Sequence, residues 1–123
     1  MNVIGLGTDI VDITKMKKII SGKRGKRFME NTFTKKEIEY AKCISIPKFA
    51  TCFAAKEAVY KAFETGWIEG KDVEVLREKE TGAPRIELHG EIKKIAKKRK
   101  IRKVLVSLSY ADSSAVAVAL LIS

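Results

Sequence analysis

The 123-residue chain has few of the side chains that usually hold zinc or carry histidine chemistry. Cys43 and Cys52 are its only cysteines and form no Cys-x-x-Cys pair, and His89 is its only histidine. A zinc site built from Cys and His ligands is therefore nearly excluded. A histidine-based catalytic triad is not expected either, because His89 lies in a plain polar turn, ELHGE. Two unpaired thiols favour a reducing compartment.

Long apolar runs are also missing. No apolar run approaches the roughly 18 residues that predict a membrane-spanning helix. The first residues, MNVIGLGTDIVDI, lack the basic region followed by a long apolar run that is typical of a signal peptide. We therefore expect a cytoplasmic protein without a membrane span.

Acidic residues are scarce relative to basic ones. The chain has 25 Lys and Arg against 15 Asp and Glu, a formal net charge of +10. Such an excess favours an acidic partner or ligand: nucleic acid, anionic lipid, a phosphorylated small molecule or an acidic protein. Charge alone does not choose among these classes. The length and the 46% hydrophobic content predict one compact domain over residues 1–123.

The start of the chain is predicted to form a strand and then a helix. Residues 3–10, VIGLGTDI, form a short strand that ends near Asp9, and residues 12–21 form a helix with one apolar face. The next stretch, SGKRGKRF at 21–28, is predicted to be a basic loop interrupted by glycine. In the first strand, the GxG pattern of Gly5 and Gly7 is a weak signal on its own, because tight packing explains it at least as often as a ligand does.

Two start signals predict the next helices. Thr34 followed three residues later by Glu37 is a capping box, and Pro47 opens a helix that runs to residue 63. The apolar residues of this second helix share one stripe: Phe49, Cys52, Phe53, Val59, Tyr60 and Phe63. Spacing alone favours a salt bridge between Glu57 and Lys61 at the edge of the stripe. Lys56 falls inside the stripe, where its amine can extend past an apolar stem to water.

The second half of the chain is predicted to be mostly strands. The expected elements are strands at 72–76 and 85–88, a basic helix at 90–100, and strands at 103–110 and 115–122. The last strand is apolar on both faces, which predicts a central strand or an interface. Its row of alanines, Ala115, Ala117 and Ala119, allows another element to approach closely.

Five motifs together resemble the holo-acyl carrier protein synthases of the phosphopantetheinyl transferase superfamily. They are IGLGTDIVDI at 4–13, RFMENTFTKKEI at 27–38, FAAKEAVYKAFETG at 53–66, GAPRIELHG at 82–90 and VSLSYADSSAVAVALL at 106–121. The resemblance covers nearly the whole chain in the right order. It implies an α+β fold in which a small antiparallel sheet packs against helices, and assembly into a homotrimer.

The resemblance also implies a reaction. These enzymes move the 4′-phosphopantetheine arm of coenzyme A onto a serine of apo-acyl carrier protein and release adenosine 3′,5′-bisphosphate, by default for fatty acid biosynthesis. It assigns Asp9 and Glu57 to a Mg²⁺ ion and Lys61 to the diphosphate, so these three residues form the catalytic set. Two carboxylates without histidine suit such a hard cation.

Further contacts follow from the resemblance. Coenzyme A is expected between neighbouring protomers, at Lys61, Gly66, Pro84, Ser109 and Tyr110. The acidic acyl carrier protein is expected on basic residues of the first helix and beyond. Candidates for this partner surface are Lys15, Lys18, Arg24 and Arg27.

Some residues keep two interpretations. Asp12 is either a helix N-terminal carboxylate, which is favoured, or a third metal ligand. Lys56 either supports the structure or contacts phosphate. The basic stretch at 93–103 is either a solvated face, which is favoured, or a source of attraction for phosphate.

The chain departs from the family at two positions. The family usually has arginine at the position of Cys52 and histidine at that of Tyr110, both near the 3′-phosphate of coenzyme A. Either that phosphate is recognised weakly here or other basic residues compensate. The candidates for compensation are Lys42, Lys48 and the 93–103 stretch.

Two other classes of protein share some of these features with the enzyme. A small nucleic-acid-binding module fits the charge, but aromatic residues are not interleaved with the basic ones as stacking platforms. A catalytically inactive, purely structural relative is disfavoured because Asp9, Glu57 and Lys61 are all present.

Overall fold

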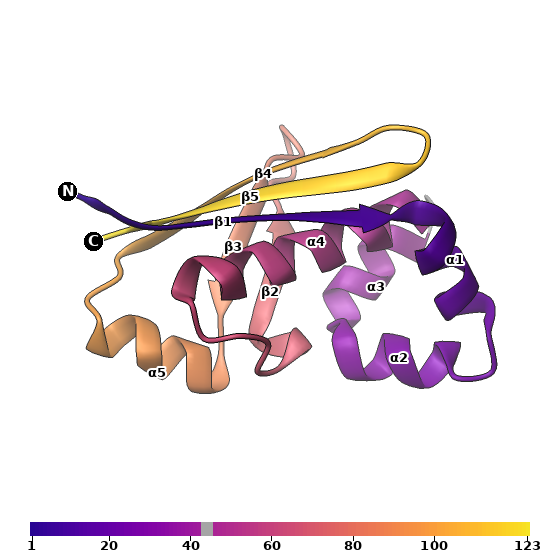
Figure 1. The fold of residues 1–123 in the computed structure, drawn as a ribbon, viewed down its shortest axis with the longest axis horizontal. Coiled ribbons are helices and arrows are strands. Elements are labelled where there is room, and N and C mark those ends of the chain that lie inside the picture. Colours follow the sequence, from indigo (N-terminus) through magenta and orange to yellow (C-terminus); the bar gives the residue numbers. More distant parts are fainter. Residues whose placement is uncertain (43–45) are drawn as a thin grey trace.

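A computed structural model describes residues 1–42 and 46–123 and has the predicted α+β architecture (Figure 1). Its elements in chain order are β1 (Val3–Asp12), α1 (Ile13–Ser21), α2 (Gly25–Thr32), α3 (Lys35–Lys42), α4 (Ile46–Phe63), a short 3-10 helix η1 (Gly70–Asp72), β2 (Val73–Arg77), β3 (Pro84–Leu88), α5 (Gly90–Lys98), β4 (Lys103–Tyr110) and β5 (Ser114–Ile122). None of the helices in this described part is long and apolar enough to cross a membrane.

The main sheet is antiparallel, with strand order β1-β5-β4, and α4 packs across one of its faces (Figure 1). The predicted central position of the last strand is therefore confirmed. Its alanine row faces α4: Ala115, Ala117 and Ala119 are fully buried. Small side chains in this row bring the helix close to the sheet, as the sequence predicted.

The two glycines of β1 serve the same close packing. A Cβ atom on Gly7 would collide with the carbonyl oxygen of Ala58 on α4, and a Cβ on Gly5 would lie 2.6 Å from that of Ala62. Side chains at these positions would push α4 off the sheet. The GxG pattern is thus explained by helix packing, without a ligand.

The rest of the chain flanks this sheet and helix. Strands β2 and β3 form an antiparallel hairpin, and β3 lies beside β4. Helices α1, α2 and α3 gather at one end of the molecule, whereas α5 lies at the other end (Figure 1). The two ends of the sheet are therefore covered by different groups of helices.

One predicted boundary is wrong. The basic stretch at 21–28 is a loop only in its first half, because α2 begins at Gly25. Tertiary packing explains the difference: the Phe28 ring packs against Phe33 and Phe53, with centroids 6.0 and 5.9 Å away. Gly25 is buried against the backbone of Ile20, where a Cβ would collide with its carbonyl. These contacts hold the second half of the segment as a helix despite the glycine at its start.

Candidate active site

The three residues predicted to be catalytic meet at one open cavity beside α4. Asp9 comes from β1, on the side of the strand that faces α4, while Glu57 and Lys61 lie one turn apart on α4 itself. The cavity measures about 360 Å³, and its wall also includes Lys15 and Phe28. Strand and helix thus bring together residues 48 and more positions apart in the sequence.

The charges at this cavity are arranged around Asp9. Lys61 Nζ lies 2.9 Å from Asp9 Oδ1, and 55% of the Lys61 side chain is exposed. The salt bridge within α4 that spacing favours, between Glu57 and Lys61, is absent from the described part of the chain. Burial raises the pKa of the Glu57 carboxyl, the charge of Asp9 raises it further, and Lys61 acts in the opposite direction. The negative charges of Asp9 and Glu57 therefore repel each other, and Lys61 partly offsets this repulsion.

This donor set fits a magnesium ion better than a transition metal. In the described residues, no group of three or more His, Cys, Asp and Glu side chains could enclose a metal. Mg²⁺ commonly binds through one or two carboxylates, with waters and substrate phosphates as its other ligands. The pair Asp9 and Glu57 has that composition.

Lys56 is not at the cavity but in the core. Its side chain is fully buried, and its Nζ donates to both carboxylate oxygens of Glu37 at 2.7 and 2.8 Å. It also lies 2.7 Å from the carbonyl oxygens of Gly70 and Val73. The expected extension of this amine to water is therefore wrong, and so is phosphate contact. Its partner Glu37 is 19 positions away, which periodicity along one helix cannot reveal.

The carboxylate of Glu37 has several other roles. Its Oε1 accepts from the backbone N–H of Thr34 at 2.8 Å, which completes the predicted capping box of α3. Its Oε2 accepts from the Val75 N–H at 2.7 Å and from the Cys52 thiol at 3.3 Å. One buried acid thus joins α3, α4 and β2.

Asp12 caps a helix, as the favoured interpretation predicted. Its Oδ1 accepts from the backbone N–H of Lys15 at 3.0 Å at the start of α1. Asp12 also lines the cavity beside α4. The capping bond accounts for the residue without a metal.

The residues predicted to contact coenzyme A fall into two separate groups. Gly66 follows α4, close in sequence to Lys61, and has a φ of +74° that favours glycine. Ser109 and Tyr110 end β4, which β5 separates from β1. Pro84 begins β3, on that same side. A single chain therefore does not bring all five predicted residues to the cavity beside α4.

Two cations lie beside Tyr110, and sequence analysis identified only one of them. Lys48 Nζ lies 5.8 Å from the Tyr110 ring centroid and 5.9 Å from that of Tyr40. Arg77, at the end of β2, places its guanidinium 5.3 Å from the Tyr40 ring centroid. No motif singles out Arg77; only the pairing of β2 with β3 and the packing of the hairpin bring it here. Cys52 is buried nearby, and burial, followed by the charge of Glu37, raises the pKa of its thiol.

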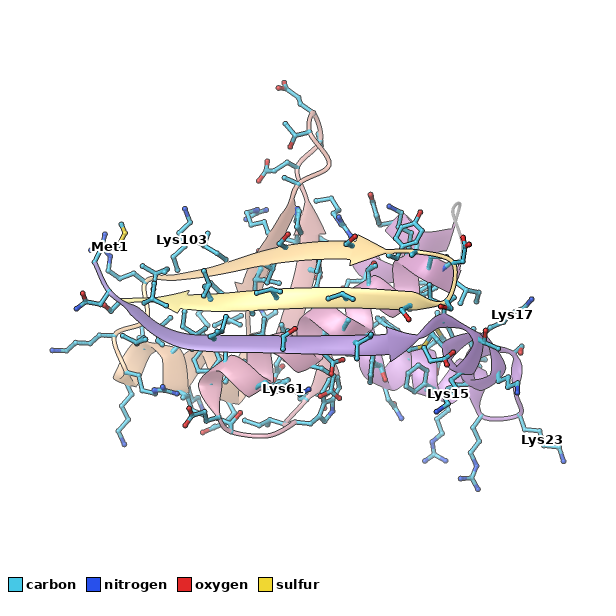
Figure 2. All side chains as sticks on the ribbon, turned by 45° about the horizontal axis from the view of Figure 1, so that its top comes forward. Met1, Lys15, Lys17, Lys23, Lys61 and Lys103 are labelled. Atoms are coloured by element: carbon cyan, nitrogen blue, oxygen red, sulfur yellow. The ribbon has the colours of Figure 1, made fainter. Side chains whose placement is uncertain are left out.

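The predicted carrier-protein residues lie at the end of the molecule that holds α1 and α2. All four, Lys15, Lys18, Arg24 and Arg27, are exposed. Lys15 also lines the cavity beside α4, and Figure 2 shows it near Lys17 and Lys23 at this end. A positively charged surface therefore adjoins the mouth of the cavity.

Comparison with known proteins agrees with the motifs. Residues 5–119 match the family model described as the 4′-phosphopantetheinyl transferase superfamily. The chain is 38% identical over 121 residues to a holo-[acyl-carrier-protein] synthase of Caldicellulosiruptor saccharolyticus, which covers 96% of this chain and 95% of the relative. A Thermoanaerobacter sp. enzyme of the same name is 39% identical over 122 residues, covering 95% and 86%.

Solved structures extend the likeness to the fold. The Helicobacter pylori holo-[acyl-carrier-protein] synthase in complex with coenzyme A has a TM-score of 0.85 at 27% identity, covering 95% of this chain and 99% of that one. The Bacillus anthracis enzyme in complex with CoA (3′,5′-ADP) has a TM-score of 0.78 at 28% identity, covering 97% and 96%. These matches decide against the nucleic-acid-binding module. The chain belongs to the 4′-phosphopantetheinyl transferase superfamily, as a member of its holo-acyl carrier protein synthases.

Proposed function

We propose that this enzyme transfers the 4′-phosphopantetheine arm of coenzyme A to a serine of an apo-acyl carrier protein, in a Mg²⁺-dependent reaction that serves fatty acid biosynthesis. The observation that carries the proposal is the meeting of Asp9, Glu57 and Lys61 at one cavity beside a positively charged surface. The cavity supplies carboxylates for a metal and an amine for a diphosphate, which are the groups this transfer requires.

Asp9 and Glu57 would hold the metal. Bound Mg²⁺ would supply the charge that neutralises the diphosphate of coenzyme A. Lys61 can leave Asp9 for this phosphate, because its side chain is more than half exposed and such a pair contributes little stability. Its amine would then stabilise the charge that develops on the departing bisphosphate.

Glu57 has a second proposed role as the base. The serine oxygen attacks the phosphorus that bears pantetheine, and the bond from that phosphorus to the bridging oxygen breaks, releasing adenosine 3′,5′-bisphosphate. The serine proton passes through a water to Glu57.

We further propose that the enzyme works as a homotrimer with coenzyme A between protomers. The face of the sheet turned away from α4 is apolar and exposed, which a second copy would cover. Its members are Leu6, Ile10, Leu105, Val116 and Val118. A neighbouring protomer could bring its Pro84, Ser109 and Tyr110 to the Lys61 and Gly66 of the first, which would complete the contacts that one chain separates.

Lys48 and Arg77 are proposed to compensate for the missing family arginine and histidine near the nucleotide. Cys52 is buried and neutral, whereas Lys48 and Arg77 flank Tyr110 together with the hydroxyls of Thr51 and Ser109. The 93–103 stretch is at the α5 end of the molecule and is not proposed to compensate. The side chain of the remaining candidate, Lys42, is outside the described part.

The acidic carrier protein is proposed to dock on the α1 and α2 end, through Lys15, Lys18, Arg24 and Arg27. The four side chains are exposed, and Lys15 reaches the catalytic cavity, so a carrier bound here would present its serine at the metal site. The proposal places the enzyme in the cytoplasm, where coenzyme A and carrier proteins are available and Cys52 stays reduced.

The test is a mass measurement on the carrier. Apo-carrier protein incubated with enzyme, coenzyme A and Mg²⁺ should gain one phosphopantetheine, and a chelator should abolish the gain. Asp9→Asn and Glu57→Gln preserve side-chain size and should lower turnover by about 10²–10³-fold at limiting Mg²⁺. Wild-type turnover in either variant would show that the site is assigned wrongly, and no gain of mass with wild type would reject the function itself.

A further inference from the structure

The end of the molecule that carries α5 has a dense group of exposed cations. This basic end comprises Lys93, Lys94, Lys97, Lys98, Lys100, Arg102 and Lys103, all exposed. Within the described residues none of them forms an ion pair. Glu91 is the one acidic residue between positions 90 and 103. The basic end therefore carries a strong, unbalanced positive potential, which the proposed transfer reaction does not use.

A groove beside the basic end combines positive charge with an aliphatic lining. It measures about 310 Å³ and lies between β3 and the start of β4. Its cations are Arg85, Arg102 and Lys103, and its apolar residues are Ile86, Leu88, Ile101 and Val104. Arg85 pairs with Glu78 at 3.3 Å, but both side chains are more than half exposed, so a stronger anion can replace that partner. This lining suits an anionic head group followed by hydrocarbon.

Exposed apolar residues lie at the same end of the sheet. Met1 is 95% exposed and Val3 is 62% exposed. Val3 on β1 and Lys103 on β4 both pair with Ile122 of β5, so they flank the same position. Figure 2 shows Met1 and Lys103 together at this end. Apolar side chains beside lysines are typical of surfaces that insert shallowly into the boundary between head groups and acyl chains.

We propose that the basic end docks the enzyme on an anionic lipid bilayer. Lysine predominates in it, and lysine clusters of this size are attracted to negatively charged membrane surfaces. Single-stranded nucleic acid fits less well, because residues 85–104 contain no Phe, Tyr or Trp on which a base could stack. The aliphatic lining of the groove can contact the hydrocarbon of a lipid, whereas a polynucleotide has no hydrocarbon chain to place there.

The position of the basic end is compatible with catalysis. Lys103 and Met1 lie at one end of the sheet, whereas Lys15, Lys17 and Lys23 lie at the opposite end (Figure 2). A protomer docked on a membrane through α5 would therefore keep its proposed carrier-docking surface and catalytic cavity accessible. The membrane contact and the transfer reaction are independent, and each can be tested without the other.

The experiment measures binding of the full chain to vesicles. Wild type is floated with vesicles of phosphatidylcholine alone, or of equal parts phosphatidylcholine and phosphatidylglycerol, at low and high salt. The test variant is K94Q/K97Q/K98Q, which removes three exposed charges from one face of α5. The matched control, K17Q/K23Q/K26Q, removes three exposed charges from the opposite end. All three proteins are also assayed for transfer to a carrier in solution and for binding to single-stranded RNA.

Wild type should bind only the phosphatidylglycerol vesicles, and high salt should release it. Each lysine near such a surface contributes a factor of about five, so the α5 variant should bind at least about tenfold more weakly. The control should bind within about twofold of wild type, and the α5 variant should transfer phosphopantetheine normally. Absence of vesicle binding, equal losses in both variants, or an α5-dependent preference for RNA over vesicles would each overturn the proposal.

Discussion

Helix α4 carries two ion pairs that have similar geometry and opposite surroundings. Lys56 Nζ lies 2.7 Å from a Glu37 oxygen with both side chains essentially inaccessible, at 0% and 1% exposure. Lys61 Nζ lies 2.9 Å from Asp9, with 55% of the lysine and 13% of the aspartate exposed. One pair is enclosed by the core and the other borders the proposed catalytic cavity. Distance alone does not distinguish their roles, but access to solvent and substrate does.

The difference follows from what else each pair contacts. Glu37 accepts from the Val75 and Thr34 backbone and from Cys52, and Lys56 donates to two carbonyl groups, so every charge has fixed partners. A buried pair of this kind is strongly destabilised when one partner is removed, because the other charge remains in the core. Within the described residues Lys61 has only Asp9 as a partner, and its exposed amine could exchange that partner for phosphate, as proposed. We infer that the first pair holds α4 in place and that the second serves chemistry.

The largest effect should come from breaking the buried pair. Lys56→Met leaves Glu37 without its counter-charge and should lower the free energy of unfolding by about 3–5 kcal/mol. Lys61→Met, the matched change five positions along the same helix, should lower it by less than about 1 kcal/mol. Denaturant unfolding of both variants measures the contrast. Similar losses for the two lysines would contradict the assigned difference between the pairs.

The exposed cations of α1 and α2 should respond to charge changes through carrier binding instead of stability. Reversing charge at Lys15 and Arg27, as Lys15→Glu and Arg27→Glu, should raise KM for the carrier about tenfold and leave KM for coenzyme A within about twofold. Added salt should weaken wild-type binding of the carrier in the same direction. Steady-state kinetics with each substrate varied in turn measures this. An equal rise in both KM values would count against a docking role.

A smaller effect is expected at the nucleotide end, where the chain departs from its family. We expect wild type to discriminate coenzyme A from 3′-dephospho-coenzyme A less sharply than the variant Cys52→Arg/Tyr110→His does. The ratio of kcat/KM for the two donors should differ by several-fold between the two proteins, because an ionic hydrogen bond to the 3′-phosphate contributes about 1.5–3 kcal/mol. The ratio of kcat/KM for the two donors measures discrimination in both proteins. If wild type already rejects the dephospho donor as strongly as the variant, Lys48 and Arg77 have rebuilt the contact completely and this expectation is wrong.

The smallest effect concerns pH and stability. The pKa of Glu57 is raised in the folded protein above its ordinary value of 4.5, so the folded state holds this proton more tightly than the unfolded state does. Stability should therefore fall slightly as pH rises from about 4.5 through the raised pKa, and Glu57→Gln should remove that component. Thermal unfolding of both proteins across this range without metal would show it. A wild-type profile parallel to that of Glu57→Gln would mean that folding does not perturb this carboxyl.

Much of this organisation could be predicted from the sequence because the signals are local. Alternation identified the strands, an apolar face identified the first helix, and the capping box of Thr34 and Glu37 identified the start of α3. The motif match supplied Asp9, Glu57 and Lys61, which the structure brings to one cavity although β1 and α4 are far apart in the chain. That juxtaposition depends on the close packing of α4 against the sheet at Gly7 and at the alanine row. From the sequence alone, close packing was only one of two explanations for the glycines of β1, and a ligand was the other.

The remaining features depend on contacts between distant segments. The partner of Lys56 lies on another helix, so a lysine within an apolar stripe suggested snorkelling instead of a buried pair. The start of α2 depends on where Phe28 packs, which outweighs two glycines. Arg77 reaches Tyr40 and the Tyr110 region only through the pairing of β2 with β3. In each case the local pattern was compatible with more than one structure, and tertiary packing decided.

The most direct test of the different roles proposed for Glu57 and Lys61 is a calorimetric titration of Mg²⁺ into the enzyme, with coenzyme A present and the carrier absent. Wild type should take up the metal. Glu57→Gln should lose this binding because half of the protein ligands are gone, whereas Lys61→Met should keep it, because Asp9 is then free of its competing cation. Metal uptake by Glu57→Gln equal to that of wild type would contradict the assignment of Asp9 and Glu57 as the metal site.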